Sequence, residues 1–155
     1  MTNRIKYPND NYKYVIEVMI KVLPARFNPN QIIEKMVFKS DFVSYVKTFK
    51  DDNKQPKKWS YKSNADDFSI LFNAIVNNVD HIFNREMLCF PKDKDIFKIT
   101  RRYDDNSIET IKFTGDLDIN DLNSLGMFIL ELVPKTEIRP NFLSCIKEEL
   151  GDYMF

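Results

Sequence analysis

The feature that most constrains the fold is the spacing of the apolar residues between Phe68 and Phe83. They recur at intervals of three and four, which places them on one face of an α-helix. The stripe consists of Phe68, Leu71, Phe72, Ile75, Val79, Ile82 and Phe83. Ser63 or Asn64 can cap the first turn. A helix over about 64–84 with such a stripe must pack against other elements, so the sequence predicts a globular protein built around it.

The composition agrees with one folded domain spanning residues 1–155. The 155 residues are 43% hydrophobic and 14% aromatic, which excludes a disordered chain, and two cysteines are too few for a disulfide scaffold. No apolar stretch approaches the roughly 18 residues that a membrane span requires, and the first residues lack the apolar region of a signal peptide. We therefore expect a cytoplasmic protein that does not bind membranes.

After Pro91 the apolar residues recur every two positions, which is typical of strands. Residues 97–103 and 107–113 alternate in this way around the loop Asp104-Asp105-Asn106. A three-residue loop with Asn106 in the left-handed conformation sets Arg101 opposite Glu109 and apolar residues opposite each other. The sequence thus predicts an antiparallel β-hairpin near residues 96–114. Because a lone hairpin is only marginally stable, we expect it either to pack on helices or to recruit a third strand from residues 86–90 or 12–23.

Residues 12–23 fit two structures. Apolar residues alternate here as in a strand, whereas Lys13, Glu17 and Lys21 recur every four residues, as on the polar side of a helix. We favour the helix, since Pro24 would end it. Further helices are predicted over about 29–37, 41–50, 121–133 and 140–150 from caps and apolar spacing. The predicted fold class is α+β, mainly helical with about five or six helices and the one hairpin.

The charge is balanced overall but uneven along the chain. There are 23 basic and 23 acidic residues in total. Residues 1–62 hold 13 basic and 6 acidic residues (+7), residues 63–103 hold 6 of each, and residues 104–155 hold 4 and 11 (−7). This gradient indicates either two faces of opposite sign, one of which meets a charged partner, or two ends that attract each other in the fold.

No segment carries a catalytic, metal or cofactor motif. Only three glycines occur, and none forms a phosphate-binding loop. Cys89 and Cys145 lie among apolar residues, and His81 is the single histidine, too few ligands for zinc. We therefore expect no catalytic residues, no metal and no cofactor. An enzyme whose carboxylates only the fold brings together remains an alternative.

The stretch 54–62 combines lysines with aromatic residues. Lysines can neutralise phosphates and aromatic rings can stack on bases, which suits single-stranded nucleic acid. The same residues would suit an acidic protein surface with the tryptophan as an anchor. Alternatively, the loop is solvated and its two aromatic rings turn inward. The candidate binding residues here are Lys57, Lys58, Trp59, Tyr61 and Lys62.

The carboxyl-terminal third supplies an acidic counterpart. Asp104, Asp105, Asp116 and Asp118 could face a basic partner, or they could serve as turn and helix-cap residues. Together these features favour a non-enzymatic protein-binding module, a small inhibitor of the antitoxin or immunity-protein kind, with a protein partner of unknown identity. The alternative is a nucleic-acid-binding protein that uses the basic and aromatic loop 54–62.

Overall fold

The computed structural model describes residues 4–6, 12–25, 31–50, 53–84, 95–114 and 120–143. In these residues there are seven strands, two α-helices and one short 3-10 helix. In chain order they are β1 (Arg4–Lys6), β2 (Tyr12–Leu23), β3 (Ile32–Lys39), β4 (Phe42–Phe49), β5 (Lys57–Lys62), α1 (Asp66–Phe83), β6 (Ile96–Tyr103), β7 (Ile108–Thr114), α2 (Asn120–Leu132) and the 3-10 helix η1 (Asn141–Leu143).

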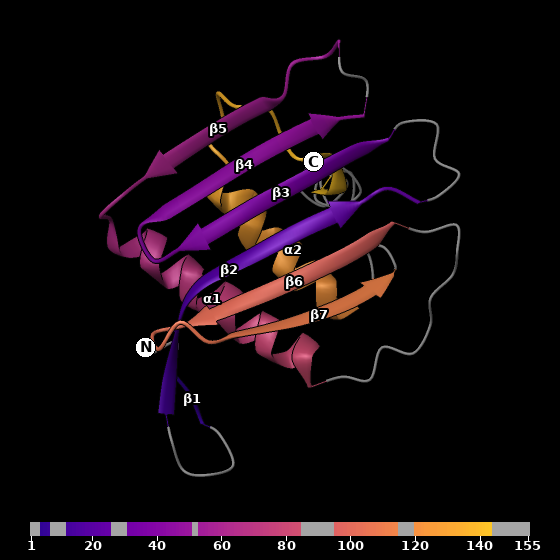
Figure 1. The fold of residues 1–155 in the computed structure, drawn as a ribbon. Helices are drawn as coiled ribbons and strands as arrows, with labels where there is room; N and C mark the ends of the chain where they lie inside the picture. The colour runs from indigo at the N-terminus through magenta and orange to yellow at the C-terminus, as the bar shows by residue number, and fades with distance from the viewer. Residues whose placement is uncertain are drawn as a thin grey trace.

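The strands form one antiparallel sheet in the order β5-β4-β3-β2-β6-β7, and β1 pairs with the beginning of β2. Strands β2 to β5 follow one another as a meander. Helix α1 then carries the chain back across the sheet, so that β6 pairs with β2 and β7 lies at the opposite edge from β5. Figure 1 shows both helices behind the sheet, on the same face.

The sheet is covered by helices on one face, which we call the inner face. Side chains that alternate along the strands point inward and meet α1 and α2 in the core. The buried strand residues include Val18, Ile20, Val22, Met36, Phe38, Val43, Tyr45, Trp59, Phe97, Ile99, Tyr103 and Phe113. Helix α1 contributes Phe68, Phe72, Ile75, Val76, Val79 and Ile82, and α2 contributes Leu125, Ile129 and Leu132. The other face, which we call the outer face, points away from both helices (Figure 1).

The predicted mainly helical fold is wrong, because the described residues are mostly strand. Residues 12–23 form β2, and the predicted helices over 29–37 and 41–50 correspond to β3 and β4. The reason is physical: a spacing of four residues is also a multiple of two, so Glu17 and Lys21 share one face of a strand as well as one face of a helix. In β4 both faces carry apolar side chains, which produced the misleading helical spacing of Phe42, Tyr45 and Val46.

The later half of the chain follows the predictions more closely. The hairpin β6–β7 has the predicted register, with Phe97 opposite Phe113 and Arg101 opposite Glu109. Asn106 takes the expected left-handed conformation, with φ 67°. The third strand is β2, which pairs with β6, so residues 12–23 take the strand alternative and not the favoured helix, while residues 86–90 lie outside the described residues. The helices near 64–84 and 121–133 are also confirmed. Of the helix predicted over 140–150, residues 141–143 form η1, and residues 144–150 lie outside the described residues.

Candidate functional site

The stretch 54–62 does not form the predicted loop beyond residue 56, because residues 57–62 are the edge strand β5. Strand alternation sends its side chains to opposite faces. Trp59 points to the inner face, where it is 7% exposed and its indole Nε1 donates a hydrogen bond to the Ile138 carbonyl oxygen at 2.9 Å. Lys58 and Lys62 lie on the outer face and are exposed. The five candidate residues of this stretch therefore do not share one surface, and Trp59 is not accessible for stacking.

The remaining two candidates of this stretch lie on the same side as Trp59. Lys57 is exposed and pairs across the strand with Lys47. Tyr61 is 48% exposed, and its ring centroid lies 6.1 Å from that of Phe68 at the start of α1. Tyr61 thus covers an edge of the core, which is the inward orientation that the sequence left open as an alternative.

The strand register aligns five lysines in one row across the outer face. Reading from β5 to β7, the directly paired positions are Lys58, Val46, Lys35, Lys21, Lys98 and Lys112. We call Lys58, Lys35, Lys21, Lys98 and Lys112 the lysine row. Three of them are exposed and the central two are half-buried. Among the described side chains, no carboxylate lies within ion-pair distance of these five ammonium groups. Like charges therefore face one another directly across the strands.

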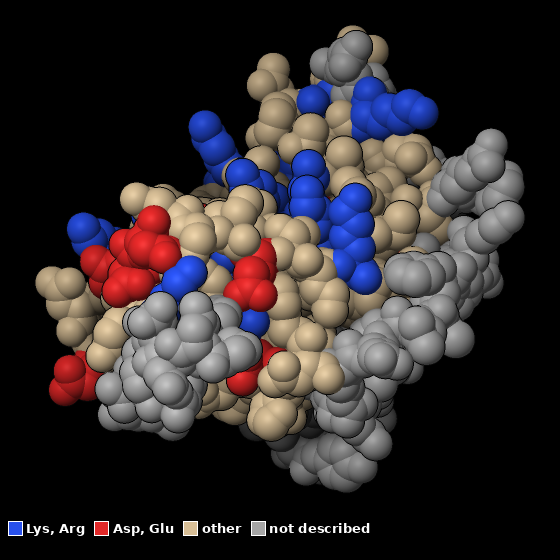
Figure 2. Space-filling model, turned by 60° about the horizontal axis from the view of Figure 1, so that its bottom comes forward, with Lys and Arg blue, Asp and Glu red and all other residues tan. Residues whose placement is uncertain are grey.

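The whole outer face is strongly basic. Its strand positions carry eight Lys and Arg and one Glu: Lys21, Lys35, Lys39, Lys58, Lys62, Lys98, Arg102, Lys112 and Glu17. By contrast, α1 and α2 contain five Asp and Glu and no Lys or Arg. Figure 2 shows Lys and Arg over the upper part of the molecule, and Asp and Glu at its left and centre with some Lys and Arg beside them. Among the described strand and helix positions, the outward side of the sheet is therefore mainly basic and the two helices are acidic.

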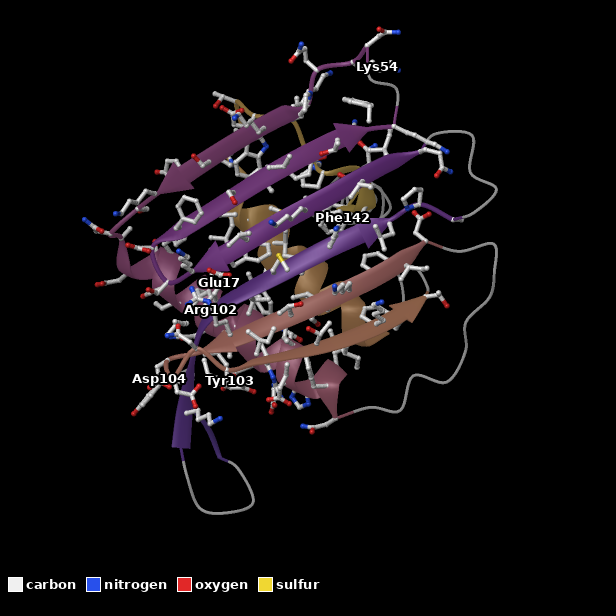
Figure 3. The ribbon with its side chains drawn as sticks, in the orientation of Figure 1. Glu17, Lys54, Arg102, Tyr103, Asp104 and Phe142 are labelled. Atoms are coloured by element: carbon white, nitrogen blue, oxygen red, sulfur yellow. The ribbon has the colours of Figure 1, made fainter. Side chains whose placement is uncertain are left out.

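The acid on the outer face is already engaged. The Glu17 carboxylate accepts a hydrogen bond from Arg102 Nη2 at 3.0 Å and lies 3.7 Å from Lys39 Nζ. Arg102 Nη1 also donates to the Asn106 side chain at 3.0 Å. Figure 3 shows Glu17 and Arg102 together, close to the turn that carries Asp104. In this corner Glu17 offsets one of its two neighbouring cations, whereas the lysine row, four residues further along the strands, has no such carboxylate among the described side chains.

The acidic candidates at the hairpin tip serve the turn. Asp104 exchanges hydrogen bonds with the backbone of Tyr14. Asp105 accepts from the Ser107 hydroxyl and amide and pairs with Lys13 at 3.0 Å. These hydrogen bonds from Ser107 and Lys13 lower the pKa of Asp105 to about 2. Asp116 and Asp118 lie outside the described residues.

A buried carboxylate that the sequence analysis missed lies on the inner face. Glu34 is 4% exposed, and its carboxylate accepts hydrogen bonds from the Tyr45 hydroxyl at 2.5 Å and from the amides of Asn141 and Phe142 at 2.7 and 3.2 Å. Burial raises the pKa of Glu34 against the opposing effect of these bonds and of Lys47. Glu34 thus caps η1 and fixes the segment after α2 to the sheet.

Arg101 is the buried cation of the inner face. It donates to Asp80 of α1 at 2.9 Å and contacts Glu109 of β7 at 3.5 Å, and its guanidinium lies 4.0 Å from the Phe83 ring centroid. The predicted pair of Arg101 and Glu109 is therefore present, with Asp80 as an unforeseen third member. The cluster joins the hairpin to α1.

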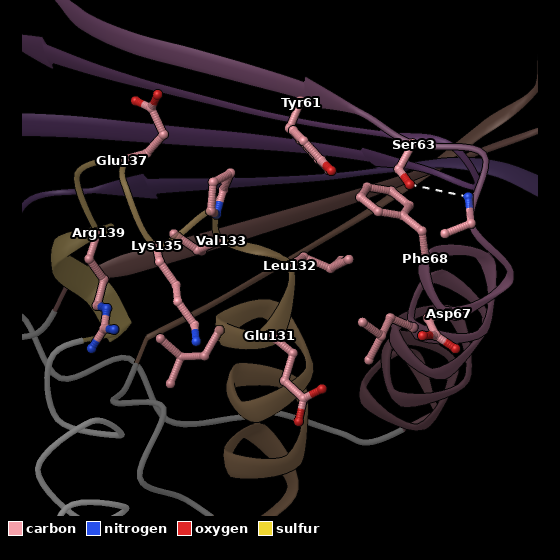
Figure 4. A pocket seen from close by; sticks show the side chains of 14 residues that line it. Tyr61, Ser63, Asp67, Phe68, Glu131, Leu132, Val133, Lys135, Glu137 and Arg139 are labelled. Carbon is pink, nitrogen blue, oxygen red and sulfur yellow. Dashed lines mark hydrogen bonds between the residues drawn. The ribbon is translucent and has the colours of Figure 1, made fainter.

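A pocket of about 630 Å³ lies between β5, α1, the end of α2 and the following turn. Phe68, Leu71 and Val133 supply apolar lining, and the charged residues around it are Asp67, Glu131, Lys135, Glu137 and Arg139 (Figure 4). All five charged residues are exposed, and the buried Glu34 does not line this pocket. It therefore lacks the pair of carboxylates, one desolvated, that the enzyme alternative requires.

Comparison with known proteins adds no assignment. No family model matches the chain, and no curated protein matches it. Neither of the two described helices is both long and apolar enough to cross a membrane. In the part of the chain that the structure describes, no three His, Cys, Asp or Glu side chains come together as a metal site. The lysine row is thus the feature that the fold leaves unexplained.

Proposed function

We propose that this protein is a non-enzymatic nucleic-acid-binding module that contacts the phosphate backbone through the outer face of its sheet. The lysine row carries this proposal. Like charges directly opposite each other destabilise a sheet, yet Lys35, Lys21, Lys98 and Lys112 occupy paired positions on four neighbouring strands. An anionic ligand would offset this repulsion, whereas folding alone offers no reason for it.

The chemistry of the face favours phosphates over a protein surface. Lysine is depleted in the cores of protein interfaces, while lysine and hydroxyl side chains are common phosphate contacts. The positions next to the lysine row supply such hydroxyls, namely Ser60, Ser44, Thr100 and Thr110. This way of binding nucleic acid differs from the one expected for loop 54–62, because Lys58 and Lys62 still contact the ligand but Trp59 does not.

A protein-binding module is the second candidate. The observation that favours it is the apolar side chains on the same face, because Val37, Met19 and Ile33 are half-buried between charged neighbours. Such a mixture suits an acidic protein with an apolar centre. An inhibitor of the antitoxin or immunity kind stays a prediction of this candidate. It would require a stoichiometric protein partner from the native host whose binding is lost when the lysine row is neutralised.

The test is a fluorescence anisotropy titration at low salt with labelled DNA of about 20 nucleotides per strand, longer than the roughly seven phosphates that the row spans along one strand. The variant Lys21→Gln/Lys98→Gln neutralises the centre of the row. Its matched control is Lys50→Gln/Lys135→Gln, which removes the same charge from two exposed lysines outside the row. We expect the affinity of the row variant for DNA to fall at least about tenfold, because each phosphate contact that is lost no longer releases counterions. The affinity of the control variant should fall only slightly.

Two results would contradict the proposal. The first is the absence of binding to any DNA at low salt, which would leave the protein partner as the remaining candidate. The second is an equal loss in both variants, since that would reflect net charge and not the row. Trp59 provides an internal check: because it lies on the inner face, saturation with DNA should leave its emission unchanged, whereas stacking on bases would quench it.

A further inference from the structure

The lysine row has a direction, and this direction limits what can bind along it. Neighbouring strands lie about 4.8 Å apart, so the row extends roughly 24 Å from β5 to β7, perpendicular to the strands. Its last four lysines follow on adjacent strands without interruption, and only Val46 breaks the row. A linear polyanion aligned with the strands would meet one lysine of the row and at most one further cation, such as Lys39 on β3 or Lys62 on β5, whereas one that crosses the strands would meet all five lysines of the row.

Among the residues that the structure describes, the strand positions adjoining the row do not provide stacking partners. Single strands are usually held by aromatic rings on which their bases stack. The adjoining positions on one side are Ser60, Ser44, Val37, Met19, Thr100 and Thr110, and on the other side Thr48, Ile33, Leu23, Ile96 and Thr114. None is aromatic. Phe42 is the nearest outward ring along β4, and it lies four residues from the row position, about 14 Å.

A double helix does not need such partners, because its bases stack on one another and its surface is a periodic array of phosphates. We infer that the ligand is a nucleic-acid double helix that lies along the lysine row and across the strands. This inference rests on the proposed function and specifies its ligand. Lysine contacts phosphate as a point charge and does not read base edges in this arrangement, so binding is independent of base sequence.

The count of lysines sets the expected salt dependence. Five phosphate contacts give a slope of log K against log salt of about −4.5 for a duplex and about −3.5 for a single strand. Neutralising Lys21 and Lys98 leaves three contacts, so the duplex slope falls to about −2.7. The slope counts contacts directly and is therefore a stricter measure than affinity at one salt concentration.

Filling the gap in the row tests its direction. Val46→Lys completes six lysines in line, and it should tighten duplex binding and steepen the slope by about 0.9. The matched control is Ile108→Lys, which adds the same charge to the same face. Ile108 is 62% exposed and lies four residues from Lys112, about 14 Å off the row. The control should leave the slope unchanged, and urea unfolding of both variants establishes that each is folded.

The deciding experiment titrates the full chain against one DNA duplex, the separate strands of that duplex and a duplex of scrambled sequence. We expect the duplex to bind at least about fivefold tighter than either strand, with less than a twofold effect of scrambling. Equal or tighter binding of single strands would overturn the double-helix inference while leaving the proposed function intact. Equal slopes of log K against log salt for the Val46→Lys and Ile108→Lys variants would overturn the inferred direction of the duplex along the lysine row. Binding to none of these probes would overturn the proposed function itself.

Discussion

Neutralising the centre of the lysine row should stabilise the folded protein, and this effect can be worked out from the strand register. Lys21 pairs with Lys35 on β3 and with Lys98 on β6, and Lys98 pairs in turn with Lys112 on β7. The double substitution Lys21→Gln/Lys98→Gln therefore removes three like-charge neighbours at once. Glutamine keeps most of the side-chain length, so the packing on the outer face changes little.

The magnitude follows from Coulomb's law. With ammonium groups about 7 Å apart in bulk water, each pair repels by about 0.6 kcal/mol before screening. Screening leaves roughly 0.5 kcal/mol per pair at 0.01 M salt, about 0.25 kcal/mol at 0.15 M and less than about 0.1 kcal/mol at 1 M. Three pairs then make the variant more stable by about 1.4 kcal/mol at 0.01 M and by only about 0.2 kcal/mol at 1 M.

Urea denaturation followed by Trp59 fluorescence measures this difference at the three salt concentrations. Urea is uncharged and therefore does not screen the lysines itself. The control Lys50→Gln/Lys135→Gln removes the same charge from two exposed residues that do not face another lysine across the sheet. Its free energy of unfolding should differ from that of the wild type by less than about 0.5 kcal/mol at every salt concentration.

The reasoning would be refuted if the row variant were less stable than the wild type at 0.01 M salt. It would also be refuted if the stabilisation did not change with salt, because only a Coulombic origin predicts that dependence. A stabilising change that abolishes nucleic-acid binding would be the signature of residues kept for binding at the expense of the fold.

Three further predictions concern the inner face and the hairpin. Glu34→Gln should lower the free energy of unfolding by about 1–3 kcal/mol, because an amide group cannot accept from every donor around it. Burial raises the pKa of Glu34 in the folded state. The contribution of Glu34 to stability is therefore greatest below its pKa in the unfolded chain and falls as pH rises through its pKa in the folded protein. Urea unfolding from pH 4 to pH 8 should show this fall in the wild type and not in the variant. Trp59→Phe should cost about 1 kcal/mol in urea unfolding, through loss of the hydrogen bond to Ile138, and a variant as stable as the wild type would show that the bond contributes nothing. Asn106→Ala should cost roughly 1–2 kcal/mol and Asn106→Gly less, because φ is 67° at this position; equal thermal unfolding temperatures of these two variants would contradict the role of the left-handed conformation.

The parts of the fold that sequence reasoning predicted are those in which one structure alone satisfies the pattern. The stripe on α1 has no strand interpretation, since its intervals of three and four residues would scatter across both faces of a sheet. The register of the hairpin could be predicted because a single register brings together the apolar pairs, the Arg101–Glu109 pair and a turn residue that tolerates positive φ. All of these are local, so no distant contact was needed to recognise them.

The same reasoning predicted helices in place of strands β2 to β4, because both faces of these strands are partly apolar. Val18, Ile20 and Val22 pack inward, while Met19 and Leu23 lie on the outer face. A sheet with apolar side chains on both faces loses the clean alternation of a half-buried strand. The irregularity between Val15 and Glu17 adds to this, because it shifts the alternation within β2.

The candidate site could be anticipated only in part. Lys58 and Lys62 belong to the basic outer face, but their aromatic neighbour Trp59 points into the core. Lys21 and Lys112 are separated by 91 positions in sequence and are joined into one row only by the pairing of β2 with β6 and of β6 with β7. Such a row is a property of register between strands, and no local spacing in the sequence encodes it.

The origin of the charge separation also explains how the row can be presented to a polyanion. Strands β2 to β5, all within the basic first 62 residues, supply five of the eight outward cations, and the helices that follow supply carboxylates and no Lys or Arg to the opposite layer. The charges of these strands and helices, taken by themselves, form a dipole perpendicular to the sheet. The net charge gives no long-range attraction to nucleic acid, but the dipole orients the approaching molecule with the lysine row toward the phosphates and the acidic helices away. Association should therefore slow with salt even though the protein as a whole is neutral, and a stopped-flow association rate independent of salt would exclude this orienting effect.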